Sequence, residues 1–272
     1  MKNRSSNEKA GIYIIIFMVA IFVVVIVLYL LGIIGKEPPS VNMIIDNNVM
    51  YKYVKNRWYE ISDNDYEEYN WKKYDIYQSN ENIGRYSVYS YDKKFYVFND
   101  NGTKRDPINV VGDGLYLGGN IKSSALKYEY SDLNKNDVDY VHKVLDAYDV
   151  DRDDQNKYTY RYKVSFDFDD DSKKEDLFVV SNLFSNEEVN HSFSFIFIRD
   201  DTGKTKMIYN RIYNKNENLV GCYAYLFGII KVDGEDVPKI VTKCSKYSVG
   251  NENEYGLYQY KSNKYELLLY SK

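Results

Sequence analysis

The sequence predicts a mainly antiparallel β ectodomain, propeller-like or sandwich-like, with one short helix, preceded by a single transmembrane α-helix. Two patterns in its 272 residues lead to this prediction: a long uncharged apolar run near the N-terminus, and many later stretches in which apolar and polar residues alternate. The composition is 44% hydrophobic and 28% charged, which excludes a wholly disordered chain. A net charge of -4 also argues against a nucleic-acid binder, because neutralising phosphates requires an excess of Lys and Arg.

The apolar run covers residues 11–35 and contains no charged residue. At a rise of about 1.5 Å per residue, a helix of this length exceeds the roughly 30 Å hydrocarbon core of a bilayer. A cleaved signal peptide would have an apolar region of about 7–15 residues and a small-residue cleavage site, and neither feature is present. We therefore expect an uncleaved signal anchor that crosses the membrane once.

The charges on either side of this run predict its orientation. Three basic residues precede it, whereas Lys36 is the sole basic residue among the next fifteen. Because positive residues stay on the cytoplasmic side, residues 1–10 are expected to form a cytoplasmic tail. Residues 36–40 contain two prolines and are expected to form a short linker. The protein would thus be located in the cell membrane, with its C-terminal part outside the cytoplasm.

Period-two alternation predicts strands and hairpins throughout the extracytoplasmic part. The clearest strand covers residues 158–168, in which Tyr, Val and Phe alternate with mainly polar residues. Residues 193–213 predict a hairpin around the turn-rich sequence Asp-Asp-Thr-Gly. Similar hairpin signals cover residues 51–58, 89–96 and 258–265. The first and last of these share the pattern Tyr-x-Tyr-x-x-Asn-basic-aromatic, which hints at an internal repeat.

One stretch has helical period instead. Apolar residues recur at helical spacing after Asn134, which is placed as the N-cap. This helix would lie in a connector, residues 131–150, between two β-rich subdomains, residues 41–130 and 151–272. The alternative is that the helix packs across a single continuous β unit.

The most informative segment for chemistry is an acidic stretch in the second half of the chain. Asp167, Asp169 and Asp171 alternate, and Glu175 adds a further carboxylate four residues later. Like charges at this spacing repel one another unless a cation binds, and hard oxygen ligands suit Ca²⁺, which accepts about six to eight oxygens. An EF-hand is disfavoured, because its twelfth position would be Phe178 and no helices are predicted on either side. The alternative is a solvated acidic turn.

The pattern Asp-x-Asp-x-Asp-x-x-x-Glu followed by Leu-Phe-Val-Val resembles the calcium loop of FG-GAP/VCBS-type repeats, which occur on extracellular proteins and usually on β-propeller blades. The resemblance implies a loop between two strands with the ligands Asp167, Asp169, Asp171, Glu175 and the main-chain oxygen of Lys173. The family commonly has Gly at the fourth and sixth loop positions, where this chain has Asp170 and Ser172. Where φ is positive, the loss of Gly would cost about 1 kcal/mol and weaken the site.

A degenerate copy of this pattern lies 64 residues later, at residues 231–239. In the same frame, Lys231 and Lys239 occupy the first and ninth ligand positions. Basic side chains thus replace two acidic ones, and this copy is not expected to hold calcium.

Other candidate residues form no recognisable catalytic or metal-binding motif. His142 and His191 are expected to be ordinary surface or satisfied residues. A disulfide between Cys222 and Cys244 is chemically allowed outside the cytoplasm. A simple hairpin would pair Cys222 with Tyr247, however, so two buried free thiols are the favoured expectation.

Aromatic side chains are abundant, with 31 Tyr residues. Trp58, Tyr59, Trp71 and Tyr74 are the candidates for stacking on sugar rings, because Tyr and Trp present flat apolar faces with polar tips. Plain packing within the sheets is the favoured interpretation of these residues.

Together these features predict a single-pass, membrane-anchored extracytoplasmic module that acts by binding and not by catalysis, and that is stabilised by Ca²⁺. The expected partner is a cell-envelope polysaccharide, another surface protein or a neighbouring membrane protein, and not nucleic acid. Two alternatives remain open: a membrane-tethered envelope glycan hydrolase, and an auxiliary subunit of a membrane complex.

Overall fold

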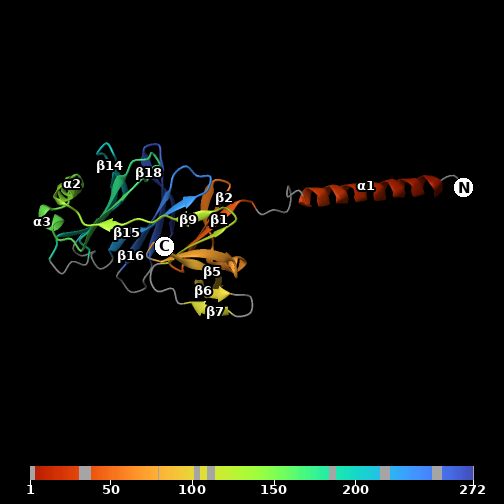
Figure 1. Cartoon of the computed structure of the whole chain (residues 1–272), viewed down its shortest axis with the longest axis horizontal. Coiled ribbons are helices and arrows are strands. Elements are labelled where there is room, and N and C mark those ends of the chain that lie inside the picture. Colours follow the sequence, from red (N-terminus) through yellow and green to blue (C-terminus); the bar gives the residue numbers. More distant parts are fainter. Residues whose placement is uncertain are drawn as a thin grey trace. The chain divides into compact units, whose positions relative to one another are not determined.

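The computed structural model contains two compact units, Met1–Pro39 and Ser40–Lys272 (Figure 1). The described residues are 4–30, 38–78, 80–100, 105–108, 114–183, 188–214, 221–246 and 253–271. Each unit is considered by itself below.

The first unit contains one helix, α1, which covers Arg4–Leu30. Its large apolar side chains from Tyr13 to Val27 are exposed. Within the described residues, no helix combines the length and the apolar character needed to cross a membrane. Residues 31–37, which include the end of the predicted span and the start of the predicted linker, lie outside the described residues.

The second unit consists mainly of antiparallel strands, which confirms the predicted β-rich class. Sheet A has the order β3-β2-β1-β8-β4-β5-β6-β7, with β1 Ser40–Ile45, β2 Val49–Val54, β3 Arg57–Glu60, β4 Lys73–Gln78, β5 Glu81–Tyr91, β6 Lys94–Asp100, β7 Arg105–Ile108 and β8 Gly114–Gly119. Sheet B has the order β18-β17-β16-β15-β9, with β9 Ser123–Ala125, β15 Cys222–Val232, β16 Lys239–Lys246, β17 Glu254–Lys261 and β18 Lys264–Ser271. Sheet C has the order β10-β11-β12-β13-β14, with β10 Tyr130–Ser131, β11 Tyr160–Phe166, β12 Glu175–Ser181, β13 His191–Arg199 and β14 Thr205–Asn214. The helical segments are η1 Asp63–Tyr69, α2 Lys135–Asp146 and α3 Arg152–Gln155.

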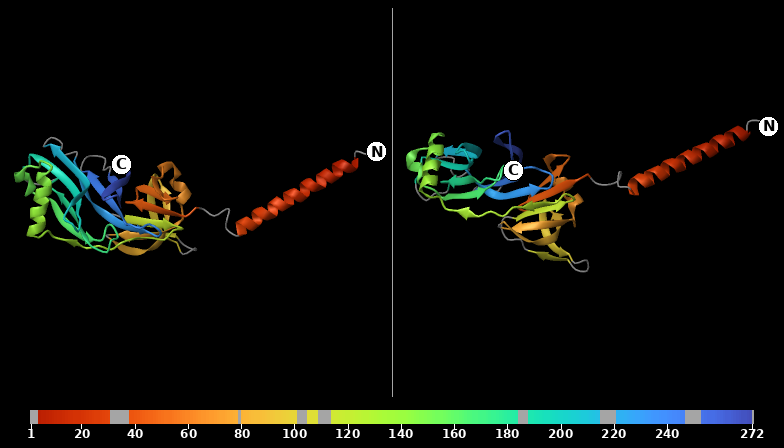
Figure 2. Two further views of the ribbon diagram at one scale, coloured as in Figure 1. Left: turned by 90° about the horizontal axis from the view of Figure 1, so that it is seen from above. Right: turned by 45° about the horizontal axis from the view of Figure 1, so that its top comes forward.

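Sheet B lies between sheets A and C (Figures 1 and 2). Ile240 of β16 belongs to a buried apolar cluster with Leu177 of sheet C, whereas the next residue, Val241, belongs to a cluster with Tyr51 of sheet A. Because successive residues of a strand point to opposite faces, β16 contributes to both cores. α2 covers the outer face of sheet C, and η1 packs on the outer face of sheet A.

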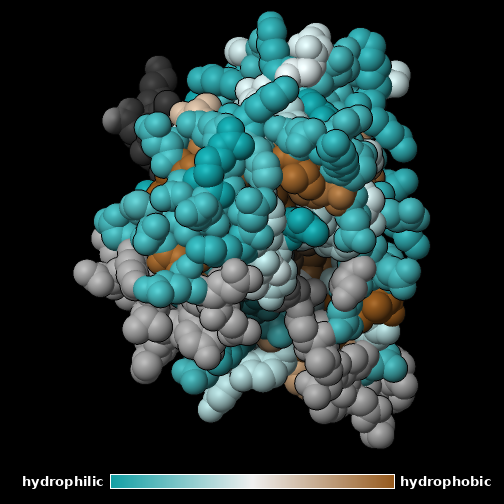
Figure 3. Space-filling view, turned by 90° about the vertical axis from the view of Figure 1, so that its left-hand side faces the viewer, coloured by the Kyte–Doolittle hydropathy of each residue, from teal (hydrophilic) through white to brown (hydrophobic). Residues whose placement is uncertain are grey.

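The resulting stack resembles a sandwich with one additional layer. It buries its apolar side chains between the sheets, and the face seen in Figure 3 is accordingly mainly hydrophilic, with small hydrophobic areas.

The predicted hairpins are present as β2–β3, β5–β6, β13–β14 and β17–β18. In the first and last, both turn residues have positive φ, as type I′ turns require. The hydroxyl of Tyr53 donates to Asn56 Oδ1 at 3.3 Å, and that of Tyr260 donates to Asn263 Oδ1 at 3.1 Å. The shared Tyr-x-Tyr-x-x-Asn pattern therefore accompanies the same turn in both places, although β5–β6 has positive φ at both turn residues without the pattern.

The predicted helix forms as α2, with Asn134 as its N-cap. The Asn134 side chain accepts the N–H of Asp137 at 3.0 Å, and the Asp137 carboxylate accepts the N–H of Asn134 at 3.3 Å. This capping box satisfies backbone groups that the first turn leaves unpaired. Two short strands precede the helix: β9 pairs with β15 in sheet B, and β10 pairs with β11 in sheet C. The other strands of these two sheets come from residues 151–272.

Cys222 and Cys244 form a disulfide, with Cα atoms 5.4 Å apart, so the expectation of two free thiols is wrong. The cause is a β-bulge in β15, where the pairing with β16 shifts by one residue between Leu226 and Gly228. A shift of one residue moves side chains to the opposite face of a sheet. Cys222 is consequently paired with Lys246, and the two cysteines lie on the same face, two positions apart.

Candidate metal centre

The acidic loop joins two neighbouring strands of sheet C, as the sequence predicts. β11 ends at Phe166 and β12 begins at Glu175, and these residues face each other in the antiparallel pair. The backbone φ is +64° at Asp170 and +71° at Ser172. These are the fourth and sixth loop positions, where FG-GAP/VCBS-type repeats commonly have Gly. The backbone at both positions is therefore in the left-handed conformation, which costs about 1 kcal/mol more for each of these residues than for glycine.

Three of the four predicted carboxylate ligands converge. Carboxylate oxygens of Asp167, Asp169 and Glu175 all lie within 4.8 Å of one another. Two oxygens that each lie about 2.4 Å from one ion are at most about 4.8 Å apart, so the spacing of these three carboxylates is compatible with one shared cation of the size of Ca²⁺. Glu175 is only 3% exposed, and the two aspartates are half-buried.

The surrounding protein satisfies these carboxylates to different extents. The two oxygens of Asp167 accept backbone N–H groups, from Asp171 at 3.1 Å and from Ser172 at 2.9 Å. One oxygen of Glu175 accepts a backbone N–H of the loop at 2.8 Å. Oδ1 of Asp169 is buried and accepts no hydrogen bond from the described residues. A buried oxygen without a partner is costly, and a bound cation would supply the missing partner.

Burial and mutual repulsion disfavour the charged forms of two of these groups. Burial raises the pKa of Glu175 to about 7, the loop N–H that it accepts opposes this rise, and the charges of Asp169 and Asp167 add to it. Burial also raises the pKa of Asp169, and the negative charges of neighbouring carboxylates add to this rise. The positive charge of Lys206 opposes it. The ammonium of Lys206 lies 3.2 Å from Asp200 and is already paired. A divalent cation would relieve this accumulation of negative charge.

Asp171 lies outside the converging group. Its Oδ1 accepts the N–H of Lys173 at 2.8 Å. The side chain of Lys173 extends to Asp201, with 2.5 Å between Nζ and Oδ2. The ligand role that the resemblance implies for the main-chain oxygen of Lys173 stays a prediction.

The β15–β16 hairpin repeats the strand pairing of the β11–β12 hairpin. Ile230 is paired with Lys239, just as Phe166 is paired with Glu175, and each residue of the first pair lies 64 positions after its counterpart in the second. Gly234, at the fourth loop position, has φ +86°. The degenerate copy detected in the sequence thus corresponds to a second loop of the same register.

A lysine side chain supplies the positive charge in this second loop. Lys239 is fully buried, and its Nζ lies 2.5 Å from the carboxylate of Glu235 and 2.9 Å from the carbonyl oxygen of Val237. Nζ of Lys231 donates to Asp170 at 2.9 Å and so links the two loops. Within the described part of the chain, by contrast, none of the three converging carboxylates forms a salt bridge with Lys or Arg.

The other residues singled out in the sequence have structural contacts. Tyr74 is fully buried in the core of sheet A. The rings of Trp58 and Trp71 lie 5.2 Å from Tyr53 and 4.9 Å from Tyr89, between centroids. Tyr59 is 38% exposed. His142 and His191 are half-buried and belong to neither described group of metal-ligating side chains.

Comparisons with protein-family models, with curated proteins and with solved structures find no match for this chain. The likeness to FG-GAP/VCBS-type repeats therefore depends on the loop residues alone. The geometry of the loop, and not a relative, has to support any statement about its role.

Proposed function

We propose that the chain is a single-pass, membrane-anchored extracytoplasmic binding module, stabilised by Ca²⁺ in the β11–β12 loop. The observation that carries the calcium site is the convergence of Asp167, Asp169 and Glu175, with one buried oxygen of Asp169 left without a hydrogen bond. Bound there, Ca²⁺ would neutralise the three carboxylates and hold the ends of β11 and β12 together. The partner is a cell-envelope glycan or another surface protein.

The membrane anchor is supported by the N-terminal sequence. Residues 11–35 contain no charge, and the large apolar side chains from Tyr13 to Val27, all within α1, are exposed. Exposed apolar side chains of a helix are stabilised by hydrocarbon and not by water. The disulfide between Cys222 and Cys244 suits the oxidising environment outside the cytoplasm.

The acidic cluster suits cation binding better than hydrolysis. A raised pKa beside a second carboxylate is also a feature of glycosidase acids. A general acid has to contact its substrate, however, and Glu175 is only 3% exposed, with one oxygen held by the loop backbone. The proposed module therefore acts by binding.

We expect Ca²⁺ to raise the melting temperature of the full chain in detergent. At a free concentration of 100 times Kd, a ligand of the folded state adds about 2.7 kcal/mol of stability, which corresponds to about 5–10 °C for a unit of this size. Asp169→Asn should abolish the shift. In chelator, the same variant should melt at or above the temperature of the wild type, because it removes one of three repelling charges.

The matched control is Asp233→Asn, which changes the equivalent third position of the β15–β16 loop, where the side chain is exposed. This variant should keep the full calcium shift. Equal melting temperatures of the wild type in calcium and in chelator would contradict the proposal, as would an unchanged shift in Asp169→Asn. Differential scanning calorimetry with Ca²⁺, with Mg²⁺ and with chelator provides the measurement.

The anchor makes a separate prediction about topology. Protease added to intact cells should degrade the C-terminal unit, Ser40–Lys272, and N-terminal sequencing of the membrane fraction should find residues 11–35 retained. A C-terminal epitope tag, followed by immunoblotting before and after permeabilisation, provides the measurement. Protection of the tag in intact cells, or a mature chain that begins beyond residue 35, would contradict the proposed location.

A further inference from the structure

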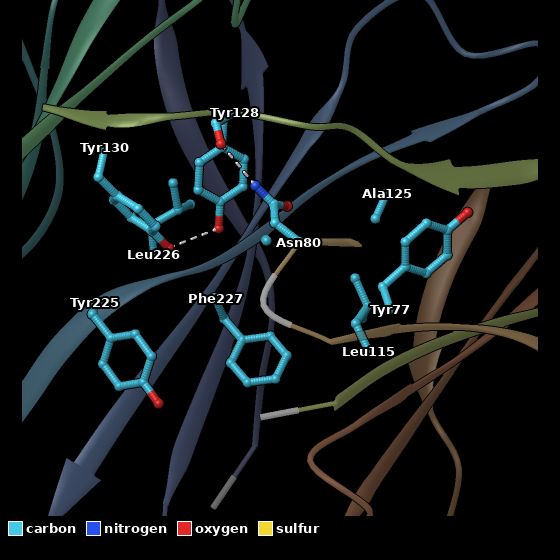
Figure 4. Close-up of a pocket in the computed structure, with 10 residues that line it drawn as sticks. Tyr77, Asn80, Leu115, Ala125, Tyr128, Tyr130, Tyr225, Leu226 and Phe227 are labelled. Carbon is cyan, nitrogen blue, oxygen red and sulfur yellow. Dashed lines mark hydrogen bonds between the residues drawn. The ribbon is translucent and has the colours of Figure 1, made fainter. Parts of the chain in front are cut away.

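A cavity of about 230 Å³ opens where the three sheets meet (Figure 4). Tyr77 and Leu115 line it from sheet A, Tyr225 and Phe227 from sheet B, and Tyr130 from sheet C. No motif in the sequence marks this site, because its residues come from distant segments of the chain.

The β-bulge of β15 shapes one wall. The pairing with β16 passes from Leu226 to Gly228, so the intervening Phe227 has no residue opposite it. The ring of Phe227 lines the cavity, and a Cβ added at Gly228 would lie 3.3 Å from Leu115 Cδ2. Glycine thus permits the close approach of sheets A and B, and bulges commonly redirect side chains at binding sites.

Hydrogen bonds hold the polar part of the lining in place. Asn80, in the turn after β4, has φ +72°, and its Nδ2 donates to the carbonyl oxygen of Tyr128 at 3.1 Å. The hydroxyl of Tyr130 donates to the hydroxyl of Tyr128 at 3.3 Å. Figure 4 shows these groups and the aromatic rings around one space. The lining is thus preorganised, which lowers the entropic cost of binding.

The charge of the lining determines what kind of ligand it fits. None of the described residues that line the cavity is charged. Nζ of Lys243 lies 6.0 and 5.8 Å from the ring centroids of Tyr225 and Phe227, and it is paired with Asp46 at 2.7 Å. A phosphate or carboxylate would therefore lose its hydration without gaining a counter-ion, so the lining favours a neutral ligand.

We propose that this cavity binds one neutral pyranose ring of a cell-envelope polysaccharide. Aromatic faces pack against the C–H groups of a sugar ring, while the phenol and amide groups can exchange hydrogen bonds with its hydroxyls. A purely apolar ligand would use none of the hydrogen-bonding capacity that these hydroxyl and amide groups retain beyond their contacts with one another. The volume is below the roughly 300–1,000 Å³ of sites for drug-sized molecules, which limits the occupant to about one ring.

The test is a titration of the full chain with neutral methyl hexosides and methyl N-acetylhexosaminides, followed by calorimetry and saturation-transfer NMR. The detergent must have a headgroup other than sugar, because a glucoside headgroup would compete. We expect saturable binding by at least one of these glycosides. Ala125→Phe, which fills the cavity from β9, should abolish binding, and Tyr130→Ala at the rim should weaken it at least about fivefold.

The matched control is Tyr160→Ala, since Tyr160 is 45% exposed and stacks on Tyr223 outside the cavity lining. Its affinity should equal that of the wild type, and melting curves should show that all three variants fold. The proposal is overturned if no neutral glycoside binds with saturation, if Ala125→Phe and Tyr130→Ala bind like the wild type, or if a uronic acid or a phenol binds more tightly than every neutral glycoside.

The glycan assignment rests on the proposed function, in which an envelope glycan is one of the partners. The two can fail separately. Glycoside binding that persists in chelator and in Asp169→Asn would support the cavity even if calcium has no effect on melting. A calcium shift in a protein that binds no glycoside would leave the metal centre in place and remove the sugar site.

Discussion

Replacing Lys239 with methionine is expected to lower the free energy of unfolding by about 3 kcal/mol. The ammonium is fully buried and lies 2.5 Å from the carboxylate of Glu235. Removing one member of a buried ion pair leaves the other charge uncompensated, which costs about 3–5 kcal/mol. We expect the lower end of this range, because the side chain of Glu235 remains 13% exposed. Urea denaturation of the full chain, followed by near-UV circular dichroism, measures the loss.

The control for this variant is Lys231→Met in the same hairpin. Its ammonium pairs with Asp170 at 2.9 Å, but the side chain is 30% exposed, so we expect a loss below about 1 kcal/mol. The double variant Glu235→Gln, Lys239→Met should recover much of the stability lost in Lys239→Met, because it removes both charges. Equal losses in the two single lysine variants would show that Lys239 does not act as the internal cation of its loop.

Removing the disulfide is the second change with a large expected effect. The double variant Cys222→Ala, Cys244→Ala should lower the free energy of unfolding by about 3 kcal/mol, because the bond closes a loop with a sequence separation of 22 residues and restricts the unfolded chain. Chemical denaturation of oxidised wild type and variant provides the comparison.

Reduced wild type serves as the control, since it keeps both sulfur atoms but lacks the cross-link. Its stability should fall close to that of the double variant. Thiol titration of the unfolded chain should count no thiol before reduction and two afterwards. Two reactive thiols without reductant would contradict the bond and would remove its support for an extracytoplasmic location.

The sequence predicted those features that depend on neighbouring residues. Alternation with period two identified β11, β13 and β14 of sheet C, and turn residues identified the type I′ hairpins, because both reflect backbone geometry over a few residues. Asn134 was recognisable as an N-cap for the same reason. Spacing alone also placed Asp167, Asp169 and Glu175 together, since all three flank one short loop.

The predictions that depended on contacts between distant segments were incomplete or wrong. The bulge between Leu226 and Gly228 brings the two cysteines to the same face of the sheet, and no local sequence pattern predicts this bulge. The role of Lys239 depends on its complete burial, which an alternating pattern of apolar and polar residues does not reveal.

The sequence predicted the β-rich class, the hairpins, the capped helix and the acidic loop, because short-range sterics and side-chain periodicity specify them. The tertiary structure revealed three further features: the sheets stack, Lys239 is fully buried beside Glu235, and an uncharged aromatic cavity opens where the sheets meet. The physical reason is that the packing free energy depends on which distant segments of the chain contact each other, and a local sequence pattern does not contain that information.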